Sequence, residues 1–122
     1  MKTVLLVEDD RWLAELYTDA LQKWCHVIHA YSPFEAFDVL EKTKIDVIVL
    51  DMFLPFVNGI AFLQELRSHT KYTQLPVVLC SSVEFTKQQK AAFEAFAVSQ
   101  IFHKPTMRMR DLAAAVEAET KK

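Results

Sequence analysis

Short apolar runs alternate with amphipathic segments along the whole chain. The apolar runs have the length of β-strands and are apolar at consecutive positions, a pattern typical of strands that are buried on both faces of a parallel sheet. The pattern predicts strands over residues 3–7, 26–30, 45–50, 76–80 and 100–103.

The segments between these runs carry apolar residues three and four positions apart, which indicates helices with one buried stripe. The first stripe comprises Leu13, Leu16, Tyr17, Ala20, Leu21 and Trp24. The second helix should begin at Ser32-Pro33, a suitable N-cap followed by proline at the first helical position. Three further helices are predicted to begin near Asn58, after Thr86 and after Thr106.

A strand followed by a helix therefore occurs five times. This order predicts an α/β fold with a parallel sheet and right-handed crossovers that place helices on both faces. No linker or low-complexity stretch divides the 122 residues, so residues 1–122 are expected to form a single domain.

Composition narrows the function classes. The net charge of −2 gives no electrostatic basis for binding nucleic acid or an acidic membrane. No stretch has the apolar length of a transmembrane helix, and Met1-Lys2-Thr3 does not lead into a signal peptide. Cys25 and Cys80 form no CxxC pair and are expected to remain reduced, so a cytoplasmic location is predicted.

Polar residues with distinctive chemistry follow four of the predicted strands. Glu8-Asp9-Asp10 follows the first, Asp51 the third, Ser81-Ser82 the fourth and Lys104-Pro105 the fifth. Because ligands of open α/β sheets bind outside the carboxyl ends of the strands, these groups should meet at one edge of the sheet.

That set of groups suits a divalent cation and a phosphoryl group. Clustered carboxylates resist joint ionisation, and Mg²⁺ relieves this by taking one or two carboxylates together with a phosphate. Asp51 could then act as a nucleophile towards phosphorus, with Lys104 pairing first with Asp51 and then with the phosphoryl oxygens. Ser81 offers a hydroxyl donor, and a cis peptide bond is predicted before Pro105.

These residues resemble the receiver domain of two-component response regulators. The resemblance rests on Glu8-Asp9 after an apolar strand, on Asp51 followed by Pro55 and Gly59, on Ser81-Ser82 after 76–80, and on Lys104-Pro105. It covers essentially the whole chain, in order and at similar spacing. It implies a flavodoxin-like, doubly wound (βα)5 fold whose five parallel strands lie in the order 2-1-3-4-5.

The resemblance also implies roles for particular residues. Asp51 would accept a phosphoryl group from a partner histidine kinase or histidine phosphotransfer protein, in a phosphorelay that controls an output partner or effector domain. Asp9 and Asp51 would bind Mg²⁺ through their side chains, Glu8 largely through water, and Phe53 through its backbone carbonyl. Ser81 and Lys104 would bind the phosphoryl oxygens. The fourth helix, fifth strand and fifth helix would form the output face, through which a phosphorylation-dependent dimer could form.

The sequence departs from the family at several positions. The resemblance makes Ser81 and Ile101 the switch region, because many receivers have at the position of Ile101 a Tyr or Phe that swings inward when the hydroxyl residue moves to the phosphoryl group. Phe102 should point to the opposite face. Ala97 stands where the family often has Gly. Phe53 and Val83 are apolar at positions that flank the path of a hydrolytic water, which predicts slow self-dephosphorylation.

Two other function classes remain open. A phosphatase with an aspartyl-phosphate intermediate would usually place a second Asp where Phe53 stands. A pseudo-receiver, in which phosphorylation is vestigial, is favoured by Ile101 and opposed by the complete set of acidic, hydroxyl and ammonium groups. The main interpretation is a phosphorylation switch that does not turn over an external substrate.

Overall fold

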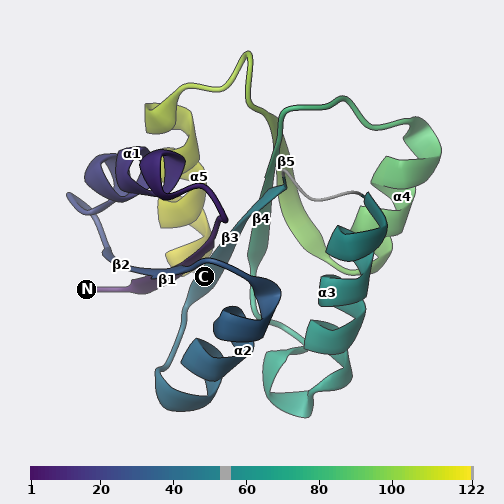
Figure 1. Ribbon diagram of the computed structural model, residues 1–122, viewed down its shortest axis with the longest axis horizontal. Helices are drawn as coiled ribbons and strands as arrows, with labels where there is room; N and C mark the ends of the chain where they lie inside the picture. Colours follow the sequence, from purple (N-terminus) through teal and green to yellow (C-terminus); the bar gives the residue numbers. More distant parts are fainter. Residues whose placement is uncertain (53–55, 122) are drawn as a thin grey trace.

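The structure is a computed structural model that describes residues 1–52 and 56–121 (Figure 1). Its centre is a sheet of five parallel strands in the order β2-β1-β3-β4-β5, as predicted. The strands are β1 (Thr3–Val7), β2 (His26–Ala30), β3 (Val47–Met52), β4 (Val77–Ser81) and β5 (Val98–His103).

Helices cover both faces of this sheet. They are α1 (Arg11–Leu21), α2 (Pro33–Lys42), α3 (Phe56–Ser68), α4 (Lys87–Ala95) and α5 (Met109–Thr120), with a short 3-10 helix η1 (Thr70–Tyr72). Helices α1 and α5 lie together against one face, while α2, α3 and α4 lie against the other (Figure 1). The alternating pattern predicted a parallel sheet covered on both faces, and the flavodoxin-like, doubly wound order is the one that the family resemblance implied.

Alternate residues of each central strand supply the two cores. In β1, Leu5 and Val7 pack towards α2, α3 and α4, whereas Val4 and Leu6 pack towards α1 and α5. Since side chains on a strand alternate between faces, an uninterrupted apolar run is what a sheet covered on both sides requires.

The apolar stripe predicted for the first helix is only partly buried. Its fully buried positions are Ala14, Tyr17 and Leu21, while Leu16 and Trp24 are 41% and 48% exposed. The helix ends at Leu21, so Trp24 lies beyond the period that would have brought it to the core.

Side chains cap the N-termini of α1, α2 and α4. Asp10 accepts hydrogen bonds from the backbone of Trp12 and Leu13, and Ser32 caps α2 ahead of Pro33, as predicted. Thr86 and Gln89 form a reciprocal capping box at the start of α4. Each cap fixes the point where the chain leaves the sheet edge that carries the polar groups.

The connection from α4 to β5 differs from the prediction. Ala97 takes φ = 59°, a left-handed conformation that ends α4 abruptly. The fifth strand therefore starts at Val98, two residues earlier than predicted, and its register against β4 shifts by one residue next to Val77.

The residues that the structure describes include no helix both long enough and apolar enough to cross a membrane.

Candidate functional site

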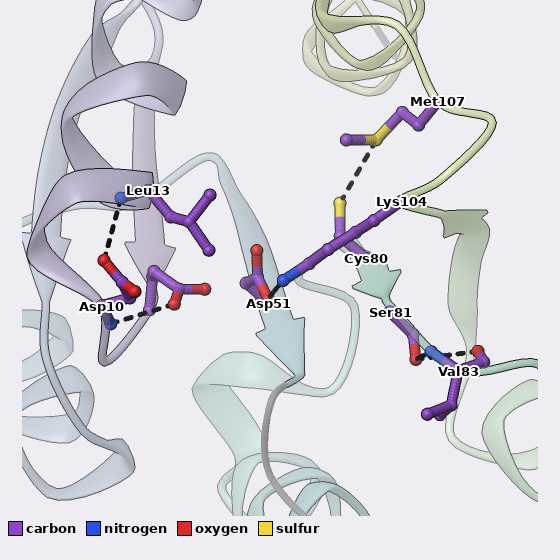
Figure 2. A network of polar contacts seen from close by, with 9 residues as sticks. Asp10, Leu13, Asp51, Cys80, Ser81, Val83, Lys104 and Met107 are labelled. Carbon is purple, nitrogen blue, oxygen red and sulfur yellow. Dashed lines mark hydrogen bonds and ion pairs between the residues drawn. The ribbon is translucent and has the colours of Figure 1, made fainter.

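Four strands bring the predicted polar residues to one edge of the sheet. Glu8 follows β1, Asp51 lies near the end of β3, Ser81 ends β4 and Lys104 follows β5. The parallel register sets Asp51 beside Cys80 of β4. Figure 2 shows Lys104 reaching from the end of β5 towards Asp51.

The central contact is an ion pair between Lys104 Nζ and Asp51 Oδ1. The Asp51 side chain is fully buried and that of Lys104 is 14% exposed, so water screens this pair weakly. The backbone N–H of Lys104 donates to the carbonyl of Ser81 at 2.7 Å, which fixes the point from which the lysine side chain extends. The predicted pairing of Lys104 with Asp51 is confirmed.

Glu8 is the second buried acid at this edge, with 1% of its surface exposed. Its Oε1 accepts a hydrogen bond from the backbone N–H of Asp10 at 3.0 Å, while its Oε2 is buried without a hydrogen-bond partner among the described residues. Burial raises the pKa of Glu8 to about 9, and the neighbouring carboxylate of Asp51 adds to the rise. Without a cation, Glu8 therefore holds its proton at neutral pH.

The three-acid cluster predicted from Glu8, Asp9 and Asp51 is not assembled in this conformation. Asp9 is exposed, and the described part of the chain contains no group of three or more His, Cys, Asp or Glu side chains arranged to hold a metal. The ammonium of Lys104 instead contacts Asp51. The Phe53 carbonyl, the fourth predicted ligand, lies outside the described residues.

The donor set nevertheless fits Mg²⁺. Two adjacent buried carboxyl groups, one with an oxygen that accepts no hydrogen bond from the described residues, form an oxygen-rich site. A hard divalent cation prefers such ligands and favours the ionised form of both acids.

Ser81 is turned away from Asp51. Its hydroxyl accepts a hydrogen bond from the N–H of Val83 at 3.1 Å and donates to the Val83 carbonyl at 3.0 Å (Figure 2). The serine is buried, whereas Val83 is 59% exposed. The hydroxyl thus closes the turn that leads from β4 towards α4.

Ile101 and Phe102 lie on opposite faces of β5. Ile101 packs against the core beneath α2, α3 and α4, and Phe102 packs against the core beneath α1 and α5. The prediction that Phe102 does not share the face of Ile101 is confirmed.

The predicted cis bond before Pro105 is wrong, because the described residues contain no cis peptide bond. The trans isomer is the intrinsically favoured one, and Pro105 here follows Lys104 in a turn. The turn is closed by Thr106 N–H to the His103 carbonyl and by Met107 N–H to the Lys104 carbonyl. Proline suits such a turn because its ring presets φ.

Sequence patterns missed several residues around the site. Tyr17 is buried, and the pKa of its phenol is raised by burial and then by the proximity of Cys80 and Asp51. Burial also raises the pKa of Cys80 to about 12, and its Sγ lies 3.8 Å from Met107 Sδ. Both cysteines are free and buried, as expected of reduced thiols.

His29 is a further residue at this edge of the sheet. Its Nε2 lies 2.5 Å from the backbone carbonyl oxygen of Glu8. The signal in the sequence would have been its place one residue before the end of an edge strand next to β1, not any histidine motif.

Comparison with known proteins identifies the family. The family model of the response regulator receiver domain matches residues 4–117. A transcriptional regulatory protein, CiaR of Streptococcus pneumoniae, is 31% identical over 113 residues, which cover 90% of this chain and 50% of that protein.

Solved structures share the fold. The chemotaxis protein CheY4 of Vibrio cholerae superimposes with a TM-score of 0.85 at 24% identity, covering 97% of this chain and 98% of that chain. A response regulator of Thermotoga maritima gives a TM-score of 0.85 at 23% identity, covering 100% and 99%.

The curated relatives are longer proteins. The chain spans 36%, 42% and 50% of the length of three of them, half or less in each case. The match over residues 4–117 and the strand order agree with the polar groups at the carboxyl edge of the sheet. This chain belongs to the receiver-domain family of two-component response regulators.

Proposed function

We propose that the protein is a phosphorelay switch whose phosphoryl acceptor is Asp51. The observation that carries this proposal is the buried Asp51 carboxylate in an ion pair with Lys104, beside a second buried acid, Glu8. A lysine–carboxylate pair at the carboxyl edge of a parallel sheet suits the roles of a nucleophile and of the cation that stabilises the developing charge.

The donor would be a phosphohistidine on a histidine kinase or a histidine phosphotransfer protein. An Asp51 carboxylate oxygen attacks phosphorus, the phosphorus–nitrogen bond breaks, and the donor imidazole leaves with the electron pair of that bond. The product is an acyl phosphate on Asp51. Lys104 is freed from its contact with Asp51 and pairs with the phosphoryl oxygens.

Glu8, Asp9 and Asp51 would hold Mg²⁺, with the Phe53 carbonyl as the further protein ligand. When bound, the cation offsets the negative charge of the acids and of the incoming phosphoryl group. The exposed Asp9 must turn towards Asp51 to contribute. Deprotonation of Glu8 accompanies this assembly, since its carboxyl holds a proton when no cation is present.

Ser81 links the chemistry to the conformation. Its hydroxyl now bonds to Val83, and a phosphoryl oxygen on Asp51 would compete for the same donor. Transfer of that hydrogen bond opens the turn at Val83 and loosens the segment that leads to the Thr86 cap of α4. The phosphoryl group thereby shifts the population towards a second arrangement of this segment.

The output surface proposed is the face formed by α4, β5 and α5, which would contact an effector domain, a separate partner or a second copy of the chain. Ile101 on β5 gives this face a smaller switch residue than an aromatic ring. We place the protein in the cytoplasm, assign it no nucleic-acid contact of its own, and expect no turnover of an external substrate.

The acyl phosphate is expected to hydrolyse slowly. Val83, two residues past Ser81, offers no polar group to orient a water molecule for attack. Replacement of Val83 by Asn should accelerate loss of the phosphoryl group from purified protein, as measured by intact-protein mass over time.

A phosphorylation-independent interaction module is the second candidate. Two observations favour it: Ile101 at the switch position, and the absence of an assembled metal cluster among the residues that the structure describes. It predicts that neither Mg²⁺ nor a phosphoryl donor alters the protein.

Intact-protein mass after incubation with acetyl phosphate and Mg²⁺ tests the proposal. A single phosphoryl adduct is expected that requires Mg²⁺ and is missing in Asp51→Asn. Asp46→Asn is a matched control, because Asp46 accepts a hydrogen bond from the backbone of Thr3 at the other end of the sheet. No adduct and no binding of beryllofluoride would contradict the switch and favour the interaction module.

A further inference from the structure

His29 contacts the segment Glu8-Asp9-Asp10, here called the acidic turn, from the neighbouring edge strand β2. It lies on β2 in register with Leu6 of β1, and its Nε2 is 2.5 Å from the carbonyl oxygen of Glu8. A carbonyl oxygen can only accept, so Nε2 must carry the proton in this contact. The contact therefore fixes the tautomer of the imidazole as well as the direction of the Glu8 carbonyl.

The Glu8 carbonyl needs this donor because the backbone ladder ends beside it. The Glu8 N–H donates to the Ala30 carbonyl at 3.0 Å, and β2 ends at Ala30. The next backbone N–H group of that segment, on Tyr31, donates to Glu35 and not to Glu8. A carbonyl on a residue as buried as Glu8 is costly without a donor, and the His29 side chain supplies one.

The imidazole is itself held in place. Its ring lies against that of Tyr31, with ring centroids 4.0 Å apart, and the Arg11 guanidinium lies 5.5 Å above the Tyr31 ring. Arg11 is the first residue of α1, directly after the acidic turn. The chain of contacts thus runs from α1 through two rings to the Glu8 carbonyl.

Hydrogen bonds tie the acidic turn to the start of α1. Glu8 is joined to Asp10 by the hydrogen bond from Asp10 N–H to Glu8 Oε1, and Asp10 caps α1. Rotation of the peptide after Glu8 would therefore displace the carboxylates of both Glu8 and Asp9. Fixing that peptide fixes the placement of two of the proposed metal ligands.

We propose that His29 is a positioning residue for the divalent cation, acting through the Glu8 carbonyl to hold the backbone from which Glu8 and Asp9 reach the cation. The inference rests on the proposed function. It requires a hydrogen-bond donor at the distance of His Nε2 from the backbone. The amide nitrogen of Gln lies as many bonds from the backbone as His Nε2, whereas the side chain of Asn is one methylene shorter.

The test compares His29→Gln with His29→Asn in a Trp24→Phe background, so that Trp12 is the remaining tryptophan. Trp12 is 68% exposed and lies three residues beyond Asp9, so its fluorescence should report on Mg²⁺ binding. We expect His29→Asn to weaken Mg²⁺ binding about tenfold, as loss of a group that orients a ligand does, and His29→Gln to restore most of the affinity. His26→Asn is the matched control, since His26 is exposed on the same strand and should leave the affinity unchanged.

Urea unfolding of each variant identifies conditions in which all are folded, and the Mg²⁺ titrations are made there. Equal affinities for wild type, His29→Gln and His29→Asn would overturn this inference alone, as would equal losses in both variants. A wild-type protein that binds no Mg²⁺ and forms no Mg²⁺-dependent adduct would overturn the proposed function and the inference together.

Discussion

Two charged clusters lie at opposite ends of the sheet. At the carboxyl ends of the strands, Glu8 and Asp51 are buried: Asp51 contacts the ammonium of Lys104, and Glu8 Oε2 accepts no hydrogen bond from the described residues. Near the start of β4 and β5, the half-buried guanidinium of Arg67 donates to the carbonyls of Tyr72, Leu75, Phe96 and Ala97 at 2.7–3.3 Å.

The difference separates a cluster whose charge is fully hydrogen-bonded from the one that we propose to react. Arg67 exchanges its hydration for carbonyl oxygens and ties α3 to the segments before β4 and β5; burial lowers its pKa, while these hydrogen bonds favour its charged form. Glu8 and Asp51 lose their hydration on folding and gain contacts only with each other and with Lys104. This incomplete compensation raises the free energy of the folded state. A bound cation and a phosphoryl group would supply what the acids lack.

Replacement of Arg67 by Met should have the largest effect on stability. Four carbonyls lose a charged donor, so we expect the free energy of unfolding to fall by about 3 kcal/mol in urea titrations. For Arg67→Lys, the free energy of unfolding should fall by about 2 kcal/mol, because one ammonium cannot reach all four oxygens. The Asp51 adduct should still form under folding conditions, and a loss below about 1 kcal/mol for Arg67→Met would show that this cluster is not a stabilising one.

The buried acid Glu8 makes the stability of the protein depend on pH, which Arg67 does not. Glu8 has a pKa of about 9 in the folded protein against an ordinary value of 4.5, so the folded state retains a proton that the unfolded state loses between these values. The free energy of unfolding should therefore fall as pH rises through this window, by about 2 kcal/mol between pH 5.5 and pH 7 with EDTA present. Mg²⁺ should reduce the fall, and its own affinity should increase with pH.

The matched variants for this dependence are Glu8→Gln and Glu65→Gln. The first removes the group that takes up the proton and should remove most of the slope, whereas the second changes an exposed carboxylate of α3 and should keep the wild-type slope. Equal slopes in wild type and Glu8→Gln would mean that Glu8 takes up no proton on folding. Its burial would then be no less completely compensated than that of Arg67.

Replacement of Ala97 by Gly should stabilise the Arg67 end. Ala97 has φ = 59°, where a Cβ is unfavourable and glycine is not. We expect a gain of about 1 kcal/mol in the free energy of unfolding, measured by urea titration. Ala95→Gly, two residues earlier in the last turn of α4, should instead lose up to about 1 kcal/mol, and a similar loss in both variants would refute backbone strain at Ala97.

The features that the sequence predicted well are those that leave a periodic or positional signal. Buried apolar runs gave the five strands, and the carboxyl ends of parallel strands placed Asp51 and Lys104 together. Strand ends were less accurate: β3 starts at Val47 and β5 at Val98, each two residues from the predicted start, because a turn or cap decides where pairing begins.

The features that could not be predicted are contacts between a side chain and a distant backbone group. Arg67 binds a carbonyl 29 residues further along the chain, and His29 binds one 21 residues earlier. Neither contact imposes a spacing or a motif on the sequence. Ser81 is a different case: its hydroxyl bonds to Val83, two residues away, and the sequence does not show which partner a strand-end serine takes.

The smallest expected effect concerns an exposed ion pair that serves as the reference for both clusters. Arg108 Nε lies 3.2 Å from Asp111 Oδ2, with side chains 64% and 43% exposed. Water screens such a pair, so Arg108→Gln should change the free energy of unfolding by less than about 0.5 kcal/mol, and added salt should reduce even that. A loss comparable to that of Arg67→Met would mean that charge alone, and not burial with complete hydrogen bonding, explains the contribution of Arg67.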